Sequence, residues 1–206
     1  MSDSYSWLVP ILACVCAGLF VLGVGGAIIY AVMRSGKAAN RAWGDVAARY
    51  GLQFKPMKAF SQPELNGEFR QRPIRAYLYS SGSHENRQTC TAVALTLKQT
   101  QSSSLGITPA GTLGNFLGRM VKAQDVEIGS PEFDARYVIK SDPPDFAGRI
   151  LGSIAAQTGI MAIPDMLGIE LRGQSLEYSK RGVAEDPELL ARVFNTLSDL
   201  ADAIER

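Results

Sequence analysis

The longest apolar run of the chain covers residues 7–33 and contains no charged side chain. A helix rises about 1.5 Å per residue, so this run is long enough to cross a hydrocarbon core of about 30 Å. Trp7 and Tyr30 stand near its two ends, and aromatic residues are common at membrane interfaces. The pattern predicts a transmembrane helix over residues 7–33, preceded by a short segment over residues 1–6.

Three other interpretations of this run fit it less well. A cleaved signal peptide has a positively charged start and a shorter apolar core, whereas the segment before the run carries only Asp3. The letters ILAC resemble part of a lipoprotein processing site around Cys14, but Leu12 stands where a small residue is needed. A dinucleotide-binding glycine loop needs a third glycine where Ile28 stands. We therefore expect a membrane anchor.

The flanks of the run predict its orientation. Basic residues follow it at Arg34, Lys37 and Arg41, and none precedes it. Because positive residues stay on the cytoplasmic side, we expect a single-pass protein of the cell membrane. Its residues 1–6 would be extracytoplasmic and its large C-terminal domain cytoplasmic.

Small residues also form a row within the run. Gly23, Ala27 and Ala31 recur every four residues, so they share one helix face. Such rows allow two membrane helices to approach closely, which gives the hypothesis of a weak homo-oligomer through helix–helix contact. A chance arrangement of glycine and alanine, which is common in membrane helices, explains the row more simply.

A second apolar pattern, with helical spacing, follows the anchor. Trp43, Val46, Ala47 and Tyr50 fall on one face, and Gly51 stands where a glycine often ends a helix. The pattern predicts a juxtamembrane helix within residues 34–51 that packs its apolar face onto the following domain.

Alternating and helical patterns then follow one another through residues 52–206. Strands are expected over residues 65–70, 74–80 and 89–97, with a turn around residues 71–73 and a short strand at residues 105–107. The segment 112–122 has one apolar helical face, formed by residues 113, 116, 117, 120 and 121. We expect it to be a core helix, while contact with a membrane surface or a partner groove is the alternative.

The last third carries the clearest signals. A strand is expected over residues 135–141, then a helix capped by Ser141 or Asp142 and ended by Gly159. A hairpin around residues 173–174 follows, and a final helix begins at an Asp186 cap and carries a broad apolar stripe. The fold class is therefore α+β, with one domain whose mainly antiparallel sheet has helices packed on one face.

Residue types that carry catalysis are sparse. The one histidine, His84, lies in a polar loop, and the letters SGKAAN lack the Ser or Thr that a phosphate-binding loop requires. Asp134 is better explained as a turn residue before a strand than as a general base. We expect no catalytic residue, no metal and no cofactor, and the near-neutral charge disfavours nucleic acid as a partner.

Charge is distributed unevenly along the chain. Residues 34–122 contain 13 basic and 4 acidic residues, whereas residues 123–206 contain 8 basic and 15 acidic residues. Basic side chains near an anchor attract an anionic leaflet, although a scattered, solvated surface explains them as well. The residues expected to contact the membrane surface are Arg34, Lys37, Arg41, Arg49, Lys55 and Lys58.

The order of these motifs resembles a group of uncharacterised bacterial membrane-anchored proteins that carry a domain of unknown function. The resemblance rests on LNGEFRQRPIRAY, on IGSPEFDARYVIKS with the SDPPDFAGRIL that follows, and on the closing hairpin and helix. It implies one N-terminal membrane helix and supplies no catalytic residue.

Two functions remain open from the sequence. The first is a non-enzymatic interaction domain that is held at the membrane and binds a protein partner near the lipid bilayer. The second is a membrane-tethered enzyme or small-ligand receptor whose pocket has no recognisable signature.

Overall fold

The computed structural model describes residues 36–57, 61–82, 87–111 and 123–206. The chain divides into two units, Met1–Ala38 and Ala39–Arg206, and the described elements belong to the second apart from the first residues of one helix. Among the described residues, no helix is both long enough and apolar enough to cross a membrane. Four predictions lie outside the described residues: the anchor over residues 7–33, its small-residue row, the helix within residues 112–122, and the loop position of His84.

The predicted helix before the domain is present over residues 36–50. Trp43, Val46 and Ala47 are buried in the core, and Gly51 ends the helix with a φ of 69°. A positive φ is easily adopted only by glycine, so the sequence pattern and the helix end agree. The apolar face that the spacing predicted is therefore the face that packs on the domain.

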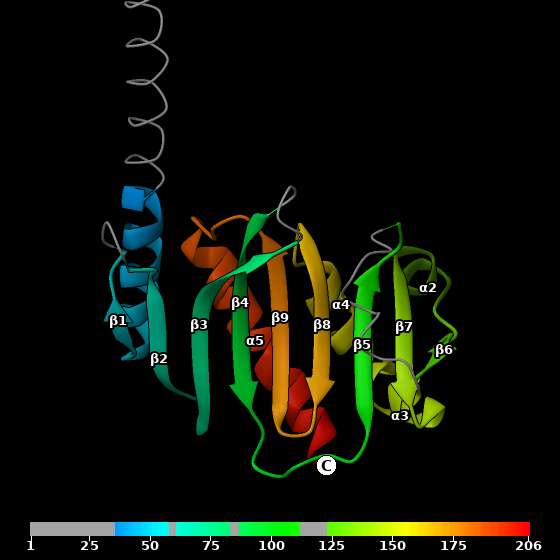
Figure 1. The fold of residues 1–206 in the computed structure, drawn as a ribbon. Coiled ribbons are helices and arrows are strands. Elements are labelled where there is room, and N and C mark those ends of the chain that lie inside the picture. Colours follow the sequence, from blue (N-terminus) through cyan, green and yellow to red (C-terminus); the bar gives the residue numbers. More distant parts are fainter. Residues whose placement is uncertain (1–35, 58–60, 83–86, 112–122) are drawn as a thin grey trace, which may run out of the picture. The chain divides into compact units, whose positions relative to one another are not determined.

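A sheet of nine strands forms the centre of the domain, and all its named strand pairs are antiparallel (Figure 1). The strand order is β1-β2-β3-β4-β9-β8-β5-β7-β6. The strands are β1 Gln53–Lys55, β2 Glu64–Phe69, β3 Arg72–Ser81, β4 Gln88–Thr96, β5 Ser104–Pro109, β6 Gln124–Val126, β7 Tyr137–Asp142, β8 Met166–Arg172 and β9 Ser175–Arg181. The mainly antiparallel α+β prediction is confirmed, while β1 and β6 were not predicted.

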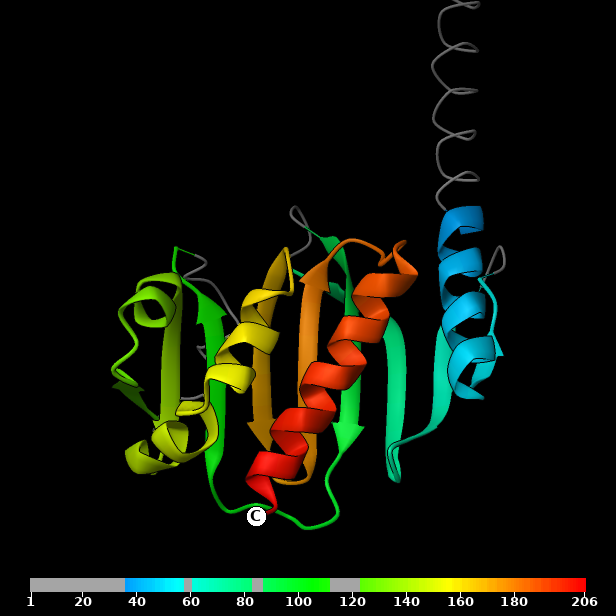
Figure 2. The same ribbon diagram turned by 180° about the vertical axis from the view of Figure 1, so that it is seen from behind.

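The described helices all lie on one face of this sheet (Figures 1 and 2). Successive strand side chains point to opposite faces, so Ile74, Ala76 and Leu78 of β3 are buried beneath the helices. The helices are the one over residues 36–50, α2 Pro131–Arg136, α3 Pro144–Leu151, α4 Ile154–Met161 and α5 Pro187–Ile204. The single hydrophobic core therefore lies between the helices and this face of the sheet.

Three aromatic rings join separate elements within that core. The ring centroids of Tyr50 and Phe69 are 5.0 Å apart with an edge-to-face arrangement, and those of Phe69 and Phe194 are 5.7 Å apart. Such pairs stabilise a fold by about 0.5–1.5 kcal/mol beyond the area they bury. The cluster holds the helix over residues 36–50, strand β2 and helix α5 together.

The final helix begins and packs as its sequence pattern predicts. Pro187 is its first residue, and the Asp186 carboxylate accepts a 2.9 Å hydrogen bond from the backbone N–H of Glu188. The stripe predicted from the sequence is buried throughout: Leu189, Leu190, Val193, Phe194, Leu197, Leu200, Ala201 and Ile204.

Replacing Asp186 with alanine is expected to lower the free energy of unfolding by about 1 kcal/mol, because a backbone donor loses its cap. Ser130 offers a matched control, since it occupies the same position before α2 but its side chain makes no capping hydrogen bond. Urea unfolding of Asp186→Ala and Ser130→Ala measures both. Equal effects of the two substitutions would contradict the capping role.

The prediction of one continuous helix from residue 143 to Gly159 is wrong, because the structure has two helices there. α3 ends at Leu151, and the hydroxyl of Ser153 accepts a hydrogen bond from the N–H of Ala156 and begins α4. Gly159 lies inside α4, where its carbonyl accepts a 3.3 Å hydrogen bond from Thr196 of α5. A residue without a side chain here allows the two helices to approach closely.

Three smaller corrections concern helix and turn ends. Neither Ser141 nor Asp142 caps α3; Pro143 precedes it and no side chain supplies a capping bond. Asp134 lies in the short helix α2 rather than in a turn, and its carboxylate accepts hydrogen bonds from the N–H groups of Ile128 and Gly129 at 3.1 and 3.0 Å. The β2–β3 turn is formed by Arg70 and Gln71, both with positive φ, so Pro73 belongs to the strand.

Candidate functional site

None of the described helices covers the second face of the sheet (Figure 1). This second face is defined by the strand residues that alternate with the core: Glu64, Arg75, Tyr77, Tyr79, Ala92, Ala94, Glu170, Glu177 and Ser179 lie on its central strands. Most of them are polar, in contrast to the apolar residues beneath the helices. This polar face is the candidate functional site.

A chain of polar contacts crosses the face from β2 to β9. The guanidinium of Arg75 donates a 2.7 Å hydrogen bond to the carboxylate of Glu64 and lies 4.9 Å from the centroid of the Tyr77 ring. The Tyr77 hydroxyl then donates a 3.0 Å hydrogen bond to the carboxylate of Glu177. These contacts fix Arg75, Glu64 and Glu177 in defined positions around Tyr77.

The Tyr77 hydroxyl reaches Glu177 because the strand between them carries small residues. Ala92 is opposite both Tyr77 and Ser179, and Ala94 is opposite both Arg75 and Glu177. On the far side, Glu170 of β8 faces Gly106 of β5. Between β4 and β5 this face therefore consists mainly of alanine, glycine and serine, together with Glu170 and Glu177.

Electrostatics at this site favour a neutral tyrosine. Burial, followed by the negative charge of Glu177, raises the pKa of Tyr77 from 10.0 to about 12. Hydrogen bonding and positive charge act on the other end of the contact chain, where the side-chain hydrogen bond of Asn66, followed by Arg75, lowers the pKa of Glu64 despite its partial burial. At neutral pH the phenol of Tyr77 remains a donor and the carboxylate of Glu64 remains an acceptor.

The raised pKa of Tyr77 predicts an alkaline loss of stability. A group whose folded-state pKa lies above its unfolded value contributes fully below the unfolded pKa of about 10, and this contribution is lost as the pH rises towards about 12. The absorbance of tyrosinate is titrated with pH in the wild type and in Tyr77→Phe. The difference between the two curves should correspond to one tyrosine that ionises with a midpoint near pH 12. A difference curve centred near 10 would contradict the burial argument.

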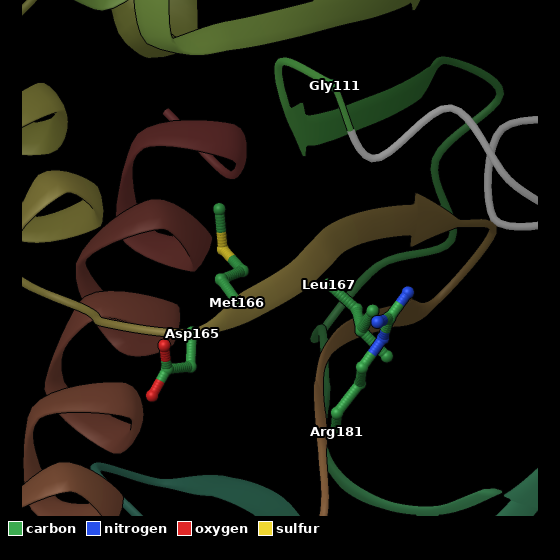
Figure 3. Close-up of a pocket in the computed structure, with 5 residues that line it drawn as sticks. All are labelled: Gly111, Asp165, Met166, Leu167 and Arg181. Carbon is green, nitrogen blue, oxygen red and sulfur yellow. The ribbon is translucent and has the colours of Figure 1, made fainter.

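Two surface pockets lie near the ends of the strands. One of about 510 Å³ is lined by Gly111, Asp165, Met166, Leu167 and Arg181. In Figure 3 the carboxylate of Asp165 and the guanidinium of Arg181 point away from each other, so the polar groups of these described lining residues do not converge. The other, of about 330 Å³, adjoins the polar face and includes Glu64, Arg75 and Tyr77 in its lining. Within the described residues, no group of three or more metal-ligating side chains is found.

The residues predicted to contact the membrane surface do not share one environment. Lys37 and Arg41 are exposed on the helix over residues 36–50, and Lys55 is exposed on β1, where it is opposite Glu64. Arg49 instead donates a 2.7 Å hydrogen bond to Glu188 of α5. Arg34 and Lys58 lie outside the described residues, as do Gly23, Ala27 and Ala31 of the proposed helix–helix contact.

Part of the uneven charge distribution is balanced inside the domain. Arg49, Arg70 and Arg72 come from the basic half of the sequence, and each forms an ion pair with an acidic residue of α5 or of its C-terminal end. The partners are Glu188, Asp199, Asp202 and Glu205. These arginines therefore stabilise the docking of α5, which the sequence pattern alone did not indicate.

The sequence interpretation missed the polar face. Strand alternation correctly separates Arg75, Tyr77 and Tyr79 from the buried residues of β3, and this was the available signal. The signal does not show which strands lie side by side. The contact between Tyr77 and Glu177 joins residues that are 100 positions apart in the sequence, and it depends on the strand order β3-β4-β9.

Comparisons with known proteins give a likeness of fold. No protein-family model matches the sequence, and no curated protein matches it. Among solved structures, the chain is similar to the crystal structure of the mycobacterial trehalose monomycolate transport factor A, TtfA, with a TM-score of 0.57. The match covers 81% of this chain and 94% of that chain at 13% sequence identity. At this identity the likeness establishes a shared fold.

Proposed function

We propose that this protein is a membrane-anchored, non-enzymatic interaction protein whose α+β domain binds a protein partner on the cytoplasmic side of the cell membrane. Residues 7–33 would form the single membrane span, with residues 1–6 outside. The polar face of the sheet would receive the partner, and exposed basic residues after the anchor, such as Lys37 and Arg41, would lie towards the lipid. The sequence resemblance to bacterial membrane-anchored proteins agrees with this proposal.

The observation that carries the proposal is the polar face itself. It is a broad surface on which hydrogen-bonding side chains hold fixed positions and small residues lie between them. It is not an enclosed cavity with convergent polar groups. Such a surface suits contact with another protein, whose interface also needs defined polar partners. The likeness of fold to a protein titled a transport factor agrees with an accessory role.

Partner binding is tested by purification of the full chain from solubilised membranes. Ala94→Arg places a large side chain on the half-buried floor of the polar face, whereas Ala48→Arg alters an exposed residue on a helix away from it. We expect one protein to be recovered with the wild type and with Ala48→Arg, and to be lost with Ala94→Arg. An unfolding midpoint equal to that of the wild type would show that Ala94→Arg folds. If Ala94→Arg does not fold, the test is repeated with Thr96→Arg, which lies at an exposed position on the same face.

The side of the membrane is tested separately. A reporter that is active only in the cytoplasm and another that is active only outside are each fused after Arg206. Activity of the cytoplasmic reporter is expected. Activity of the external reporter would overturn the orientation and direct the search for a partner to the cell envelope.

A further inference from the structure

A shallow pocket of about 330 Å³ lies where the polar face reaches strand β1. Three of its lining residues form one row across the sheet, since Lys55 of β1 is directly opposite Glu64 of β2, and Glu64 is directly opposite Tyr77 of β3. Arg75 stands two residues before Tyr77 and therefore on the same face, which no described helix covers (Figure 1). The surface formed by Lys55, Glu64, Arg75 and Tyr77 is called the basic recess below.

Positive charge exceeds negative charge in the described lining of the basic recess. Lys55 and Arg75 are its two cations, and Glu64 is its one carboxylate. Glu64 forms an ion pair with Arg75, and only 23% of its side chain is exposed, whereas Lys55 is exposed and forms no ion pair with a described residue. Two further acids of this face, Glu68 of β2 and Glu177 of β9, lie outside the lining. One positive charge of the recess is therefore left uncompensated.

The guanidinium of Arg75 is held in place and still has donors for a ligand. Its Nε–H donates a 2.7 Å hydrogen bond to Glu64, and its central carbon lies 4.9 Å from the centroid of the Tyr77 ring. Its two terminal amino groups donate no hydrogen bond to a described residue, and 56% of the side chain is exposed. A guanidinium presents its N–H groups as a planar fork that matches the two oxygens of a carboxylate. The contacts with Glu64 and Tyr77 therefore fix the orientation of this fork.

We propose that the partner places an aspartate or glutamate side chain in the basic recess, with its carboxylate between the ammonium group of Lys55 and the terminal amino groups of Arg75. Because β2 separates their two strands, the cations start about 10 Å apart at the backbone, a distance that two long side chains span towards one carboxylate. The inference rests on the proposed function, since it specifies the chemistry of the partner at the same face.

The charge of the recess favours a carboxylate over a phosphate. A carboxylate brings one negative charge, which equals the uncompensated positive charge, and its oxygens accept charge-assisted hydrogen bonds from both cations. A phosphate monoester brings about −1.5 to −2 charges at pH 7, and the neighbouring Glu64 would repel the excess. An acidic side chain of a protein is therefore the better complement.

Site-specific photo-crosslinking in membranes that contain the full chain tests the inference. Gln53 is exposed on β1, two residues before Lys55, so it lies on the same face beside the recess without lining it. A photoreactive residue replaces Gln53 in the wild type, in Lys55→Gln, in Arg75→Gln and in Arg192→Gln. Arg192 is the matched control, because it is a similarly exposed arginine in an ion pair but belongs to α5 on the helix-covered face (Figure 2).

The inference expects one protein adduct from position 53, mapped by mass spectrometry to a segment that contains aspartate or glutamate. Its yield should fall about fivefold in Lys55→Gln and in Arg75→Gln, because each removes one partly exposed charge pair, and it should stay unchanged in Arg192→Gln. Exchanging the mapped acidic residue for lysine should restore the adduct of Arg75→Glu. Lys55→Gln tests the inference by itself if the Arg75 variants do not fold, since Lys55 is exposed.

The other outcomes separate the inference from the proposed function. A protein adduct that is insensitive to both substitutions, or that maps to a segment without an acidic residue, would overturn the inference and leave the proposed function standing. The absence of an adduct from position 53, while one protein still co-purifies with the wild type, would do the same. Adducts confined to lipid or to this chain would overturn both.

Discussion

Replacing Arg72 with methionine should lower the free energy of unfolding by about 3–5 kcal/mol. The side chain of Arg72 is only 5% exposed, and its guanidinium donates hydrogen bonds of 2.7 Å to Asp202 and 2.6 Å to Glu205. The Glu205 carboxylate also accepts a 2.5 Å hydrogen bond from the backbone N–H of Lys98. Removing the cation leaves Glu205 largely buried without its opposite charge. Urea unfolding followed by circular dichroism measures the loss.

Arg70 supplies the matched control for this prediction. Its guanidinium forms comparable bonds to Asp199 and Asn195 of α5, at 2.6 and 2.7 Å, but its side chain is 46% exposed. Exposed pairs contribute under about 1 kcal/mol, because water solvates both charges in the unpaired state. Arg70→Met should therefore have a small effect. Similar losses in Arg70→Met and Arg72→Met would show that burial does not set the contribution of these ion pairs.

The same buried pair predicts an acid sensitivity. Burial acts to raise the pKa of Glu205, but the hydrogen bonds from Arg72 and from the Lys98 backbone outweigh it, so the pKa is lowered in the folded protein. A lowered folded-state pKa gives stability that is present above the unfolded value and lost as the pH falls through the folded one. The stability difference between the wild type and Glu205→Gln should therefore shrink as the pH falls below about 4.5. A difference that is independent of pH would contradict this.

The elements that the sequence predicts well are those defined by one local pattern. The apolar stripe of α5 repeats over 18 residues, and Asp186 and Pro187 mark its start. The local sequence therefore determines both the position and the buried face of this helix. The helix break at Gly152 was missed because apolar residues continue on both sides of it. The break depends on the hydroxyl of Ser153 capping a new helix, which competes with continuation of α3.

The candidate site was harder to predict than the fold, because it depends on which strands lie side by side. Glu170 and Glu177 are separated by a hairpin that the sequence predicts, so their cross-strand pairing follows once the turn is fixed. The position of Tyr77 beside Glu177 requires in addition that β9 pairs with β4. The uneven charge distribution suggested contact with a membrane surface. Instead, Arg49, Arg70 and Arg72 form ion pairs with acidic residues of α5. These residues are far apart in the sequence, so their pairing could not be predicted from local patterns.

Trp43 connects the helix over residues 36–50 to the segment between β9 and α5. Its side chain is fully buried, and its indole N–H donates a 2.8 Å hydrogen bond to the carbonyl of Ala184. The same segment is bound from β4 by the hydroxyl of Thr91, which accepts from the N–H of Ala184 at 2.9 Å and donates to the carbonyl of Gly182 at 2.8 Å. The indole therefore fills the core and fixes the path of the chain into α5.

Replacing Trp43 with alanine should cost about 3–5 kcal/mol, since it leaves a large cavity and an unpaired buried carbonyl. Trp43→Phe keeps most of the ring volume and removes only the donor, so a smaller loss of about 1–3 kcal/mol is expected. Circular dichroism is the appropriate measurement, because the substitution removes one of the two tryptophans of the chain and would alter fluorescence directly. If Trp43→Phe were as damaging as Trp43→Ala, the hydrogen bond to Ala184 would dominate over packing. If neither substitution had an effect, the burial of Trp43 and its hydrogen bond to Ala184 would contribute nothing to the stability of the domain.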